Sequence, residues 1–408
     1  MSKSAFGQQY DSPTAWQRFY GRFVEWIGPQ LFGRPKVGAI TFVFPNGHTR
    51  TMGRPGTGFH PTLRFRNFRV LGAVVRRGTL GFAECYINGD VEIDDLTALF
   101  RMFLQNQERL GPGKIGAAAQ DLAYHLSRAN TREMSPQNIS EHYDLGNDFY
   151  GEWLDSSMTY SSALFSSADQ SLEAAQLAKY RRVAEMAGVR PGHSILEIGC
   201  GWGGFAETAA RDFGADVRGI TLSREQLAFA QERMRRQGLD GRVELVFEDY
   251  RDTIGQFDHI ASIEMIEAVG EEHWPQYFRT VHDRLKPGGT AAIQAITIRE
   301  QDFEDYKRNP DFIQRYIFPG GMLLTETAMR DEAARAGLVL ESSERFRKSY
   351  ARTLRLWRDR FLERWDAIAP LGYDEPFRRK WLYYLAYCEA GFEEGRIDVG
   401  IYRYRRPA

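Results

Sequence analysis

The sequence predicts an α/β protein, with a larger part built on a doubly wound, mainly parallel sheet and a smaller N-terminal part of α+β type. Two observations predict it. From about residue 170 onward, helical and strand patterns alternate, as βαβ units require. In addition, the apolar strand Ser194–Ile198 leads into a glycine-rich turn and then a helical pattern. Such a strand–loop–helix unit binds adenosine-containing cofactors at the carboxyl end of a parallel sheet.

Length and composition indicate two domains and no membrane span. The chain has 408 residues, and we predict a basic N-terminal domain over residues 1–130 and a catalytic domain over residues 131–408. No run of about 18 apolar residues occurs, and the N-terminus lacks an apolar signal core. The three cysteines show no metal-ligand spacing, so no metal site is predicted. We therefore expect a cytoplasmic protein.

In the N-terminal part, short apolar runs predict strands at Ala39–Phe44, Thr62–Val70 and Ala83–Ile87. An Asn-Gly pair between Gly78 and Asp94 predicts a hairpin-type turn. A helix is expected over Asp94–Gln107.

The larger part carries the alternating elements. Expected strands are Ser194–Ile198, Asp216–Thr221, Val243–Phe247, His259–Glu264, Thr290–Ile298 and an edge strand at Val399–Tyr404. Expected helices are Leu172–Ala187, a short one from Phe205, Arg224–Gln237 opened by Ser223, an apolar stripe from Phe346 to Trp365, and Phe377–Ala390. The long segment Arg299–Gly321 is typical of an insertion that covers a binding site.

Charge is unevenly placed although the net charge is only −1. No acidic residue occurs between Glu25 and Glu84, whereas that stretch holds nine cations. They are Arg34, Lys36, Arg50, Arg54, Arg64, Arg66, Arg69, Arg76 and Arg77. A basic stretch without counter-charge suits nucleic acid or an anionic membrane surface, where each cation contributes roughly 1 kcal/mol.

The glycine loop identifies the type of cofactor. Gly199, Gly201 and Gly203 follow at every second position, whereas a dinucleotide loop has Gly-x-Gly-x-x-Gly. The next strand ends at Thr221 rather than at an acid, and no phosphate-binding Gly-Lys-Ser/Thr motif occurs. A glycine loop preceded by Glu197 suits S-adenosylmethionine, which has no phosphate and carries two cationic groups.

Several longer motifs resemble the cyclopropane-fatty-acyl-phospholipid synthases and mycolic acid cyclopropane synthases, a family of class I S-adenosylmethionine-dependent methyltransferases. The similarity spans about residues 141–405. The motifs are Glu141–Tyr150, Trp153–Asp155, Met158–Ser161, Leu196–Gly203, Gly219–Gln226, Ser262–Gly270, Tyr316–Gly321 and Ser349–Leu354. The N-terminal part resembles, with weaker motifs, the lipid-binding domain of the bacterial enzymes.

The resemblance implies S-adenosylmethionine as methyl donor and the cis double bond of a phospholipid acyl chain as acceptor. It favours a peripheral membrane site over nucleic acid, and it implies a homodimer. The residues at donor-contacting positions are Tyr160, Ser161, Glu197, Gly199, Cys200, Gly201, Trp202, Gly203, Thr221, Gln226, Glu248 and Asp249.

The family is also expected to use a bound bicarbonate as the base that removes a proton after methyl transfer. The matching catalytic positions here are Glu267, Tyr350, Ser162, Gln294 and Ile296. Glu264, three residues before Glu267, is expected to take no part. Ser162 and Gln294 depart from the cysteine and histidine of the cyclopropane synthases, and glutamine does not relay a proton near pH 7 as histidine does.

The departures at Ser162 and Gln294 bear on which product forms. Loss of a methyl proton from the first carbocation gives a cyclopropane, whereas a prior hydride shift gives an exocyclic methylene, a precursor of branched or furan fatty acids. We expect the cyclopropane, with the methylene as the alternative. Two other classes are a methyltransferase for a small soluble nucleophile and a non-catalytic lipid-binding protein.

Overall fold

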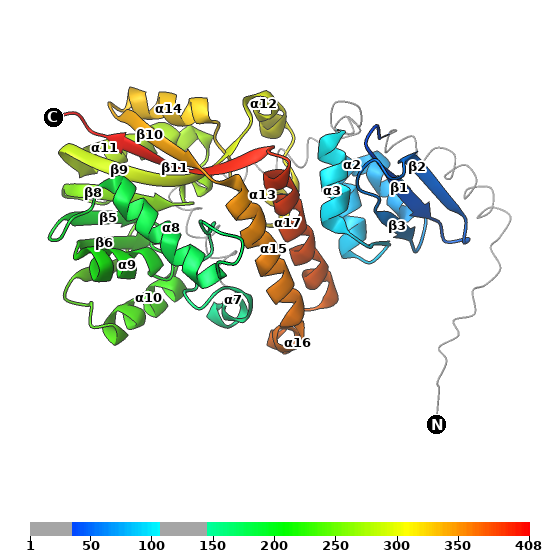
Figure 1. The fold of residues 1–408 in the computed structure, drawn as a ribbon, viewed down its shortest axis with the longest axis horizontal. Helices are drawn as coiled ribbons and strands as arrows, with labels where there is room; N and C mark the ends of the chain where they lie inside the picture. Colours follow the sequence, from blue (N-terminus) through cyan, green and yellow to red (C-terminus); the bar gives the residue numbers. More distant parts are fainter. Residues whose placement is uncertain (1–34, 107–144) are drawn as a thin grey trace. The chain divides into compact units, whose positions relative to one another are not determined.

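The computed structural model describes residues 35–106 and 145–408. The chain divides into two compact units, residues 1–116 and 117–408, here called the smaller and the larger unit (Figure 1). The predicted boundary at residue 130 lies outside the described residues and stays a prediction. Arg34 and residues 141–144 of the first family motif also lie outside them.

Within residues 35–106, the smaller unit contains a four-stranded sheet of order β2-β1-β3-β4 and two helices. Its elements are β1 (Gly38–Val43), β2 (Thr49–Arg54), β3 (Thr62–Phe65), α2 (Arg69–Ile87), β4 (Val91–Ile93) and α3 (Leu96–Gln105). The predicted strand at 39–44 and the predicted helix at 94–107 are thus confirmed within two residues. Asp95 caps α3 by accepting from the N–H of Ala98 at 2.8 Å.

Three predictions for this unit are wrong. The strand from Thr62 ends at Phe65, and Ala83–Ile87 lies inside helix α2. Asn88 and Gly89 consequently end a helix instead of joining two strands, and Gly89 takes a φ of +78°. The reason is that a short apolar run fits a buried helix face as well as a strand. Strand β2 was missed because only Met52 of its six residues is buried.

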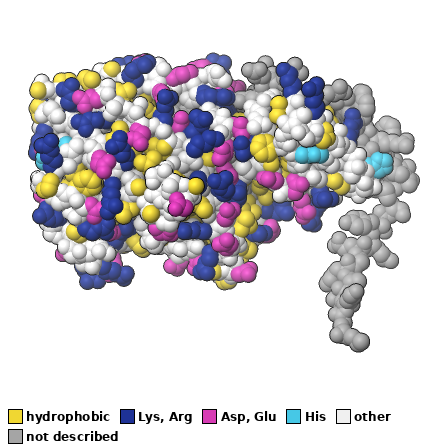
Figure 2. Space-filling model, in the orientation of Figure 1, with side chains coloured by type: hydrophobic (Ala, Val, Ile, Leu, Met, Phe, Trp, Pro, Cys, Tyr) yellow, Lys and Arg dark blue, Asp and Glu magenta, His cyan; other side chains and the backbone are white. Residues whose placement is uncertain are grey.

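The basic stretch does have some counter-charges. Arg66 pairs with Glu92, and Arg77 pairs with Glu84. Arg54 and Arg64 are exposed. On the face of the larger unit seen in Figure 2, basic and acidic side chains are interspersed.

The larger unit is built on a seven-stranded sheet of order β10-β11-β9-β8-β5-β6-β7. Strands β5 to β9 are parallel, β11 is antiparallel to β9, and β10 is antiparallel to β11. The strands are β5 (Ser194–Ile198), β6 (Asp216–Thr221), β7 (Val243–Phe247), β8 (Phe257–Ile263), β9 (Leu285–Ile298), β10 (Val339–Arg345) and β11 (Ile397–Arg405). The predicted doubly wound sheet is confirmed, but β11 is an interior strand and not the predicted edge.

Helices cover this sheet (Figure 1). They are α7 (Asn147–Trp153), α8 (Leu172–Ala187), α9 (Gly204–Phe213), α10 (Arg224–Arg236), α11 (Trp274–Arg284), α12 (Glu300–Arg308), α13 (Phe312–Tyr316), α14 (Glu326–Arg335), α15 (Arg347–Glu363), α16 (Trp365–Ile368) and α17 (Glu375–Glu393). The predicted cap is present, because the Ser223 hydroxyl accepts from the N–H of Gln226 at 3.2 Å. No helix among the described residues is long and apolar enough to cross a membrane.

The strand order reverses beside β5. The chain proceeds from β5 to β6 and β7 on one side and then places β8 and β9 on the other. In open α/β sheets, ligands bind at the carboxyl ends of the strands next to such a reversal. The residues that follow β5 and β8 are therefore the ones to examine for a site.

Candidate active site

The loop after β5 is tied to the sheet and leaves free space at one glycine. The N–H groups of Gly199 and Cys200 both donate to the carbonyl of Ile220 in β6, at 3.0 and 2.9 Å. A Cβ on Gly199 would lie 2.9 Å from the Met265 side chain, whereas a Cβ on Gly201 would meet nothing within 4 Å. Gly201 has a φ of +52°. The loop thus turns tightly and leaves room for a ligand against its backbone.

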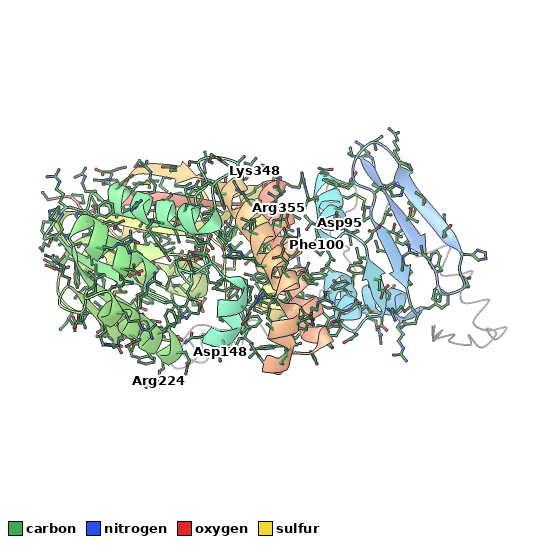
Figure 3. The ribbon with its side chains drawn as sticks, turned by 60° about the horizontal axis from the view of Figure 1, so that its bottom comes forward. Asp95, Phe100, Asp148, Arg224, Lys348 and Arg355 are labelled. Atoms are coloured by element: carbon green, nitrogen blue, oxygen red, sulfur yellow. The ribbon has the colours of Figure 1, made fainter. Side chains whose placement is uncertain are left out.

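Two neighbours of this loop define its surroundings. Glu197 is buried, its Oε2 has no partner among the described residues, and burial raises the pKa of its carboxyl. The Trp202 indole N–H donates to Asn147 Oδ1 at 2.7 Å, which joins the loop to the start of α7. Figure 3 shows Asp148 of α7 and Arg224 of α10 at the same edge of the unit. A buried acceptor without a partner is the feature that a cationic ligand group would satisfy.

The ends of β6 and β7 supply further polar groups. The Thr221 hydroxyl donates to Gln226 Oε1 at 3.2 Å. Glu248 accepts from Arg218 at 2.7 Å, and its Oε1 is buried without a partner among the described residues. Asp249, by contrast, is held by Arg251, whose Nε donates to it at 2.8 Å. Thr221, Gln226 and Glu248 therefore offer groups suited to a nucleoside, while the carboxylate of Asp249 is engaged.

Residues 160–162 form a segment that reaches both the helices and the end of β8. The Tyr160 hydroxyl is hydrogen-bonded to that of Tyr384 in α17 at 2.9 Å. Ser161 accepts from Lys179 of α8, whose Nζ lies 2.6 Å from Ser161 Oγ. The backbone N–H of Ser162 donates to Glu264 Oε1 at 2.8 Å.

Glu264 lies at the centre of the predicted catalytic residues. Besides the Ser162 N–H, its Oε1 accepts from Gln294 Nε2 at 2.7 Å, and its Oε2 accepts from the Tyr350 hydroxyl at 2.6 Å. The residue has a φ of +51°, a left-handed conformation that is uncommon outside glycine. Burial raises the pKa of the Glu264 carboxyl, while the hydrogen bonds from Tyr350 and Ser162 oppose this rise. Glu264, which was not expected to take part, thus forms hydrogen bonds with three predicted site residues.

Glu267 and Ile296 form a second contact beside this cluster. The N–H of Ile296 donates to Glu267 Oε1 at 2.6 Å, and Glu267 Oε2 is buried with no partner among the described residues. Burial, together with the nearby Glu264, raises the pKa of Glu267 to about 8. Since Glu264 has three donors and Glu267 has one, the negative charge of the pair is better stabilised on Glu264 than on Glu267.

These contacts do not fit a bound bicarbonate. The Ser162 N–H, the Gln294 amide and the Tyr350 hydroxyl, which the resemblance assigned to that ion, all bind the Glu264 carboxylate instead. A carboxylate of the chain itself occupies the anion's donors. No group of ligands that could hold a metal ion occurs among the described residues.

Aromatic rings surround the segment that carries Tyr160. Its ring centroid lies 5.3 Å from that of Tyr150, 5.6 Å from Trp153 and 5.3 Å from Trp357. Tyr350 stacks on Phe392 with centroids 4.4 Å apart. Aromatic faces attract cations without forming bonds to them. The site therefore combines a π-rich wall with one anionic carboxylate.

Two residues of this site were not predicted from the sequence. Glu264 was passed over because Glu267 matches the family motif, and only the left-handed backbone reveals where its carboxylate points. Lys179 is completely buried, but within a helical pattern a single lysine gives no sign of burial.

Comparison with known proteins agrees with this fold. The family model described as mycolic acid cyclopropane synthetase matches residues 130–401. The chain is 40% identical over 343 residues to the tuberculostearic acid methyltransferase UfaA1 of Mycobacterium tuberculosis, covering 79% of this chain and 78% of that protein. It is 36% identical over 339 residues to the cyclopropane-fatty-acyl-phospholipid synthase of Escherichia coli, covering 83% and 86%.

Solved structures give the same result. The cyclopropane synthase MmaA2 from Mycobacterium tuberculosis matches with a TM-score of 0.62 and 30% identity, over 66% of this chain and 98% of that one. The mycolic acid cyclopropane synthase CmaA1 in complex with SAH and CTAB matches with a TM-score of 0.63 and 28% identity, over the same shares. The larger unit therefore has the class I methyltransferase fold, and the chain belongs to the family of cyclopropane synthases and fatty acid methyltransferases.

Proposed function

We propose that this protein transfers a methyl group from S-adenosylmethionine to the cis double bond of an unsaturated phospholipid acyl chain, with Glu264 as the general base. The observation that carries the proposal is the Glu264 carboxylate, fixed by donors from Ser162, Gln294 and Tyr350. The free space at Gly201 and the unpaired Glu197 oxygen fit the donor.

The residues divide the chemistry between them. The donor supplies an electrophilic methyl group, and the π electrons of the alkene form the new C–C bond as the C–S bond breaks. This leaves a carbocation on the acyl chain, beside the rings of Tyr160, Trp357 and Tyr350. Glu264 then accepts a proton from the added methyl group, and the electrons of that C–H bond neutralise the cation. A water-excluded site is needed because water would trap the cation.

For the product, we favour the exocyclic methylene. In that route a hydride first moves from the methyl-bearing carbon to the neighbouring cationic carbon. Loss of a methyl proton then gives a C=C bond to the added carbon. The 40% identity to a protein named as a tuberculostearic acid methyltransferase supports this product.

The cyclopropane remains the second candidate. It is supported by the 36% identity to the cyclopropane-fatty-acyl-phospholipid synthase over 83% of the chain. In that route the methyl proton leaves before any hydride moves, and the freed electron pair closes the ring onto the cationic carbon.

The proposed acceptor lies in a membrane, and we assign docking on anionic lipid to the smaller unit. Its exposed arginines, among them Arg54 and Arg64, would interact with lipid phosphates. Several such cations give reversible binding, because each contributes roughly 1 kcal/mol near an anionic surface.

Incubation of the protein with isotope-labelled donor and vesicles of unsaturated anionic phospholipid tests the proposal. We expect label in the acyl chains, and proton NMR distinguishes vinylic methylene signals from upfield ring signals.

Glu264→Gln should lower turnover about 10²–10⁴-fold, the usual contribution of a general base. Binding of S-adenosylhomocysteine should remain unchanged, since Glu264 contacts the acceptor's proton and not the donor loop. Absence of label with the wild-type protein would refute methyl transfer to the acyl chain. Full activity of Glu264→Gln would refute Glu264 as the general base.

A further inference from the structure

Lys179 in α8 is a buried cation. Its side chain is completely buried, its Nζ donates to Ser161 Oγ at 2.6 Å, and it lies 3.9 Å from the centre of the Tyr180 ring. No carboxylate lies within ion-pair distance of it among the described residues. Burying an ammonium group is costly unless its N–H groups are used. The position therefore calls for an explanation.

The groups around Ser161 leave both donors and acceptors unpaired. The Ser161 carbonyl accepts from Gln176 Nε2 at 2.9 Å, and its hydroxyl oxygen accepts from Lys179. The hydroxyl hydrogen of Ser161 has no hydrogen-bond acceptor among the described residues, and Lys179 donates one hydrogen bond there while its ammonium group also lies over the Tyr180 ring. Glu197 Oε2 and Gln176 Oε1 are buried acceptors that also lack one there.

This combination matches one kind of ligand group. Unpaired donors suit a carboxylate, and unpaired acceptors suit an ammonium group. An α-amino acid carries both on one carbon atom. Ser161 lies next to Tyr160, and Glu197 lies in β5 just before the glycine loop, so these groups belong to the donor side of the site.

We propose that Lys179 is a positioning residue for the amino acid end of the methyl donor. By occupying a lone pair of Ser161 Oγ, its ammonium group directs the Ser161 O–H toward the carboxylate of the donor. Glu197 receives the ammonium group of the donor. This inference rests on one part of the proposed function, namely that the methyl donor is S-adenosylmethionine.

The acidic groups that face Lys179 favour its protonated form and so oppose the effect of burial. Burial lowers its pKa to about 7, and Glu264 at the end of β8, Asp155 before the Tyr160 segment and Glu197 at the end of β5 oppose that shift.

Calorimetric titration with two ligands tests the proposal. S-adenosylhomocysteine carries the amino acid end, and methylthioadenosine is a nucleoside thioether without it. Lys179→Met should weaken binding of S-adenosylhomocysteine about 10- to 100-fold, the range of a charge-assisted hydrogen bond, and leave methylthioadenosine binding unchanged. Ser161→Ala should give the same pattern, and the double variant should lose no more than the stronger single variant. Lys348→Met, at an exposed lysine of α15, is the control.

Other outcomes overturn the inference. Equal loss for both ligands indicates a purely structural role for Lys179, and no loss for either ligand removes it from the donor site. If Lys179→Met fails to fold, Ser161→Ala still decides whether binding depends on the amino acid end. Wild-type protein that binds S-adenosylhomocysteine but methylates no lipid refutes the proposed acceptor and leaves this test intact.

Discussion

At the scale of single residues, Glu264 has the clearest consequence. Its left-handed backbone places a carboxylate among three donors, and glycine adopts this conformation without strain. Glu264→Gly should therefore fold well and free the donors of Ser162, Gln294 and Tyr350 for a small anion. We expect this variant to be inactive without bicarbonate and partly active when bicarbonate is added.

The wild-type protein should show no such dependence, because its own carboxylate already fills the position. Assays in carbon dioxide-free buffer, with and without added bicarbonate, make the comparison. Glu264→Gln is the matched control, since its amide keeps the space filled. Stimulation of the wild-type protein by bicarbonate would contradict the assignment of Glu264 as base.

Glu267 should make stability depend on pH. Its pKa of about 8 in the folded protein exceeds the ordinary value of 4.5, so the folded state retains a proton that the unfolded state loses between these values. Stability is therefore lost as the pH rises from about 4.5 to 8. Glu267→Gln imitates the neutral acid, and its Tm relative to the wild-type protein should increase across this range. Parallel Tm curves for the two proteins would show that Glu267 is ionised throughout.

At the scale of elements, the glycine loop allows a matched pair of substitutions. A Cβ at Gly201 or at Gly192 would meet nothing within 4 Å, and both residues have positive φ values. Each change to alanine should cost about 1–2 kcal/mol of stability, the cost of left-handed backbone. Only Gly201→Ala should weaken binding of S-adenosylhomocysteine, by at least tenfold in calorimetry, because Gly192 lies at the opposite end of β5. Equal affinity of both variants would place the donor elsewhere.

The elements of the larger unit could largely be predicted from the sequence, and those of the smaller unit could not. Strands β5 to β9 are largely apolar, and helical patterns separate all of them except β7 and β8, so local signals agree with the sheet. In the smaller unit, Ala83–Ile87 has a strand-like composition, and only packing against the sheet decides for helix α2. The interior place of β11 depends on its pairing with β9 and β10, which no local pattern encodes.

For the site, motifs identified Ser162, Gln294 and Tyr350, which the structure brings together. They could not identify Glu264, because its role follows from one backbone angle, nor Lys179, because its role follows from burial. The roles of the predicted donor-binding and catalytic residues stay predictions, and the contacts of Asp249 with Arg251 make Asp249 the least suited of them to bind a ligand.

At the scale of the whole molecule, charge on the smaller unit should govern lipid binding. The exposed residues Arg54 and Arg64 can be reversed without breaking an ion pair that the structure contains. The double variant Arg54→Glu/Arg64→Glu should float at least tenfold less with anionic vesicles at low salt, and wild-type binding should weaken as salt rises. Reversal of Arg236 and Arg308, exposed in the larger unit, is the control. Equal flotation of both double variants would exclude the smaller unit as the docking surface.

The interior position of β11 has a consequence for folding. Ile397–Arg405 pairs with β9 on one side and β10 on the other, yet it follows every other strand along the chain. During synthesis, one edge of β9 therefore stays unpaired until β11 leaves the ribosome. Until then β10 also has no neighbouring strand in the sheet. Such long-range closure is slow, and an open edge invites pairing between nascent chains. Strand β9 also carries Gln294 and Ile296, so we expect this part of the candidate site to become rigid only after β11 has paired with β9.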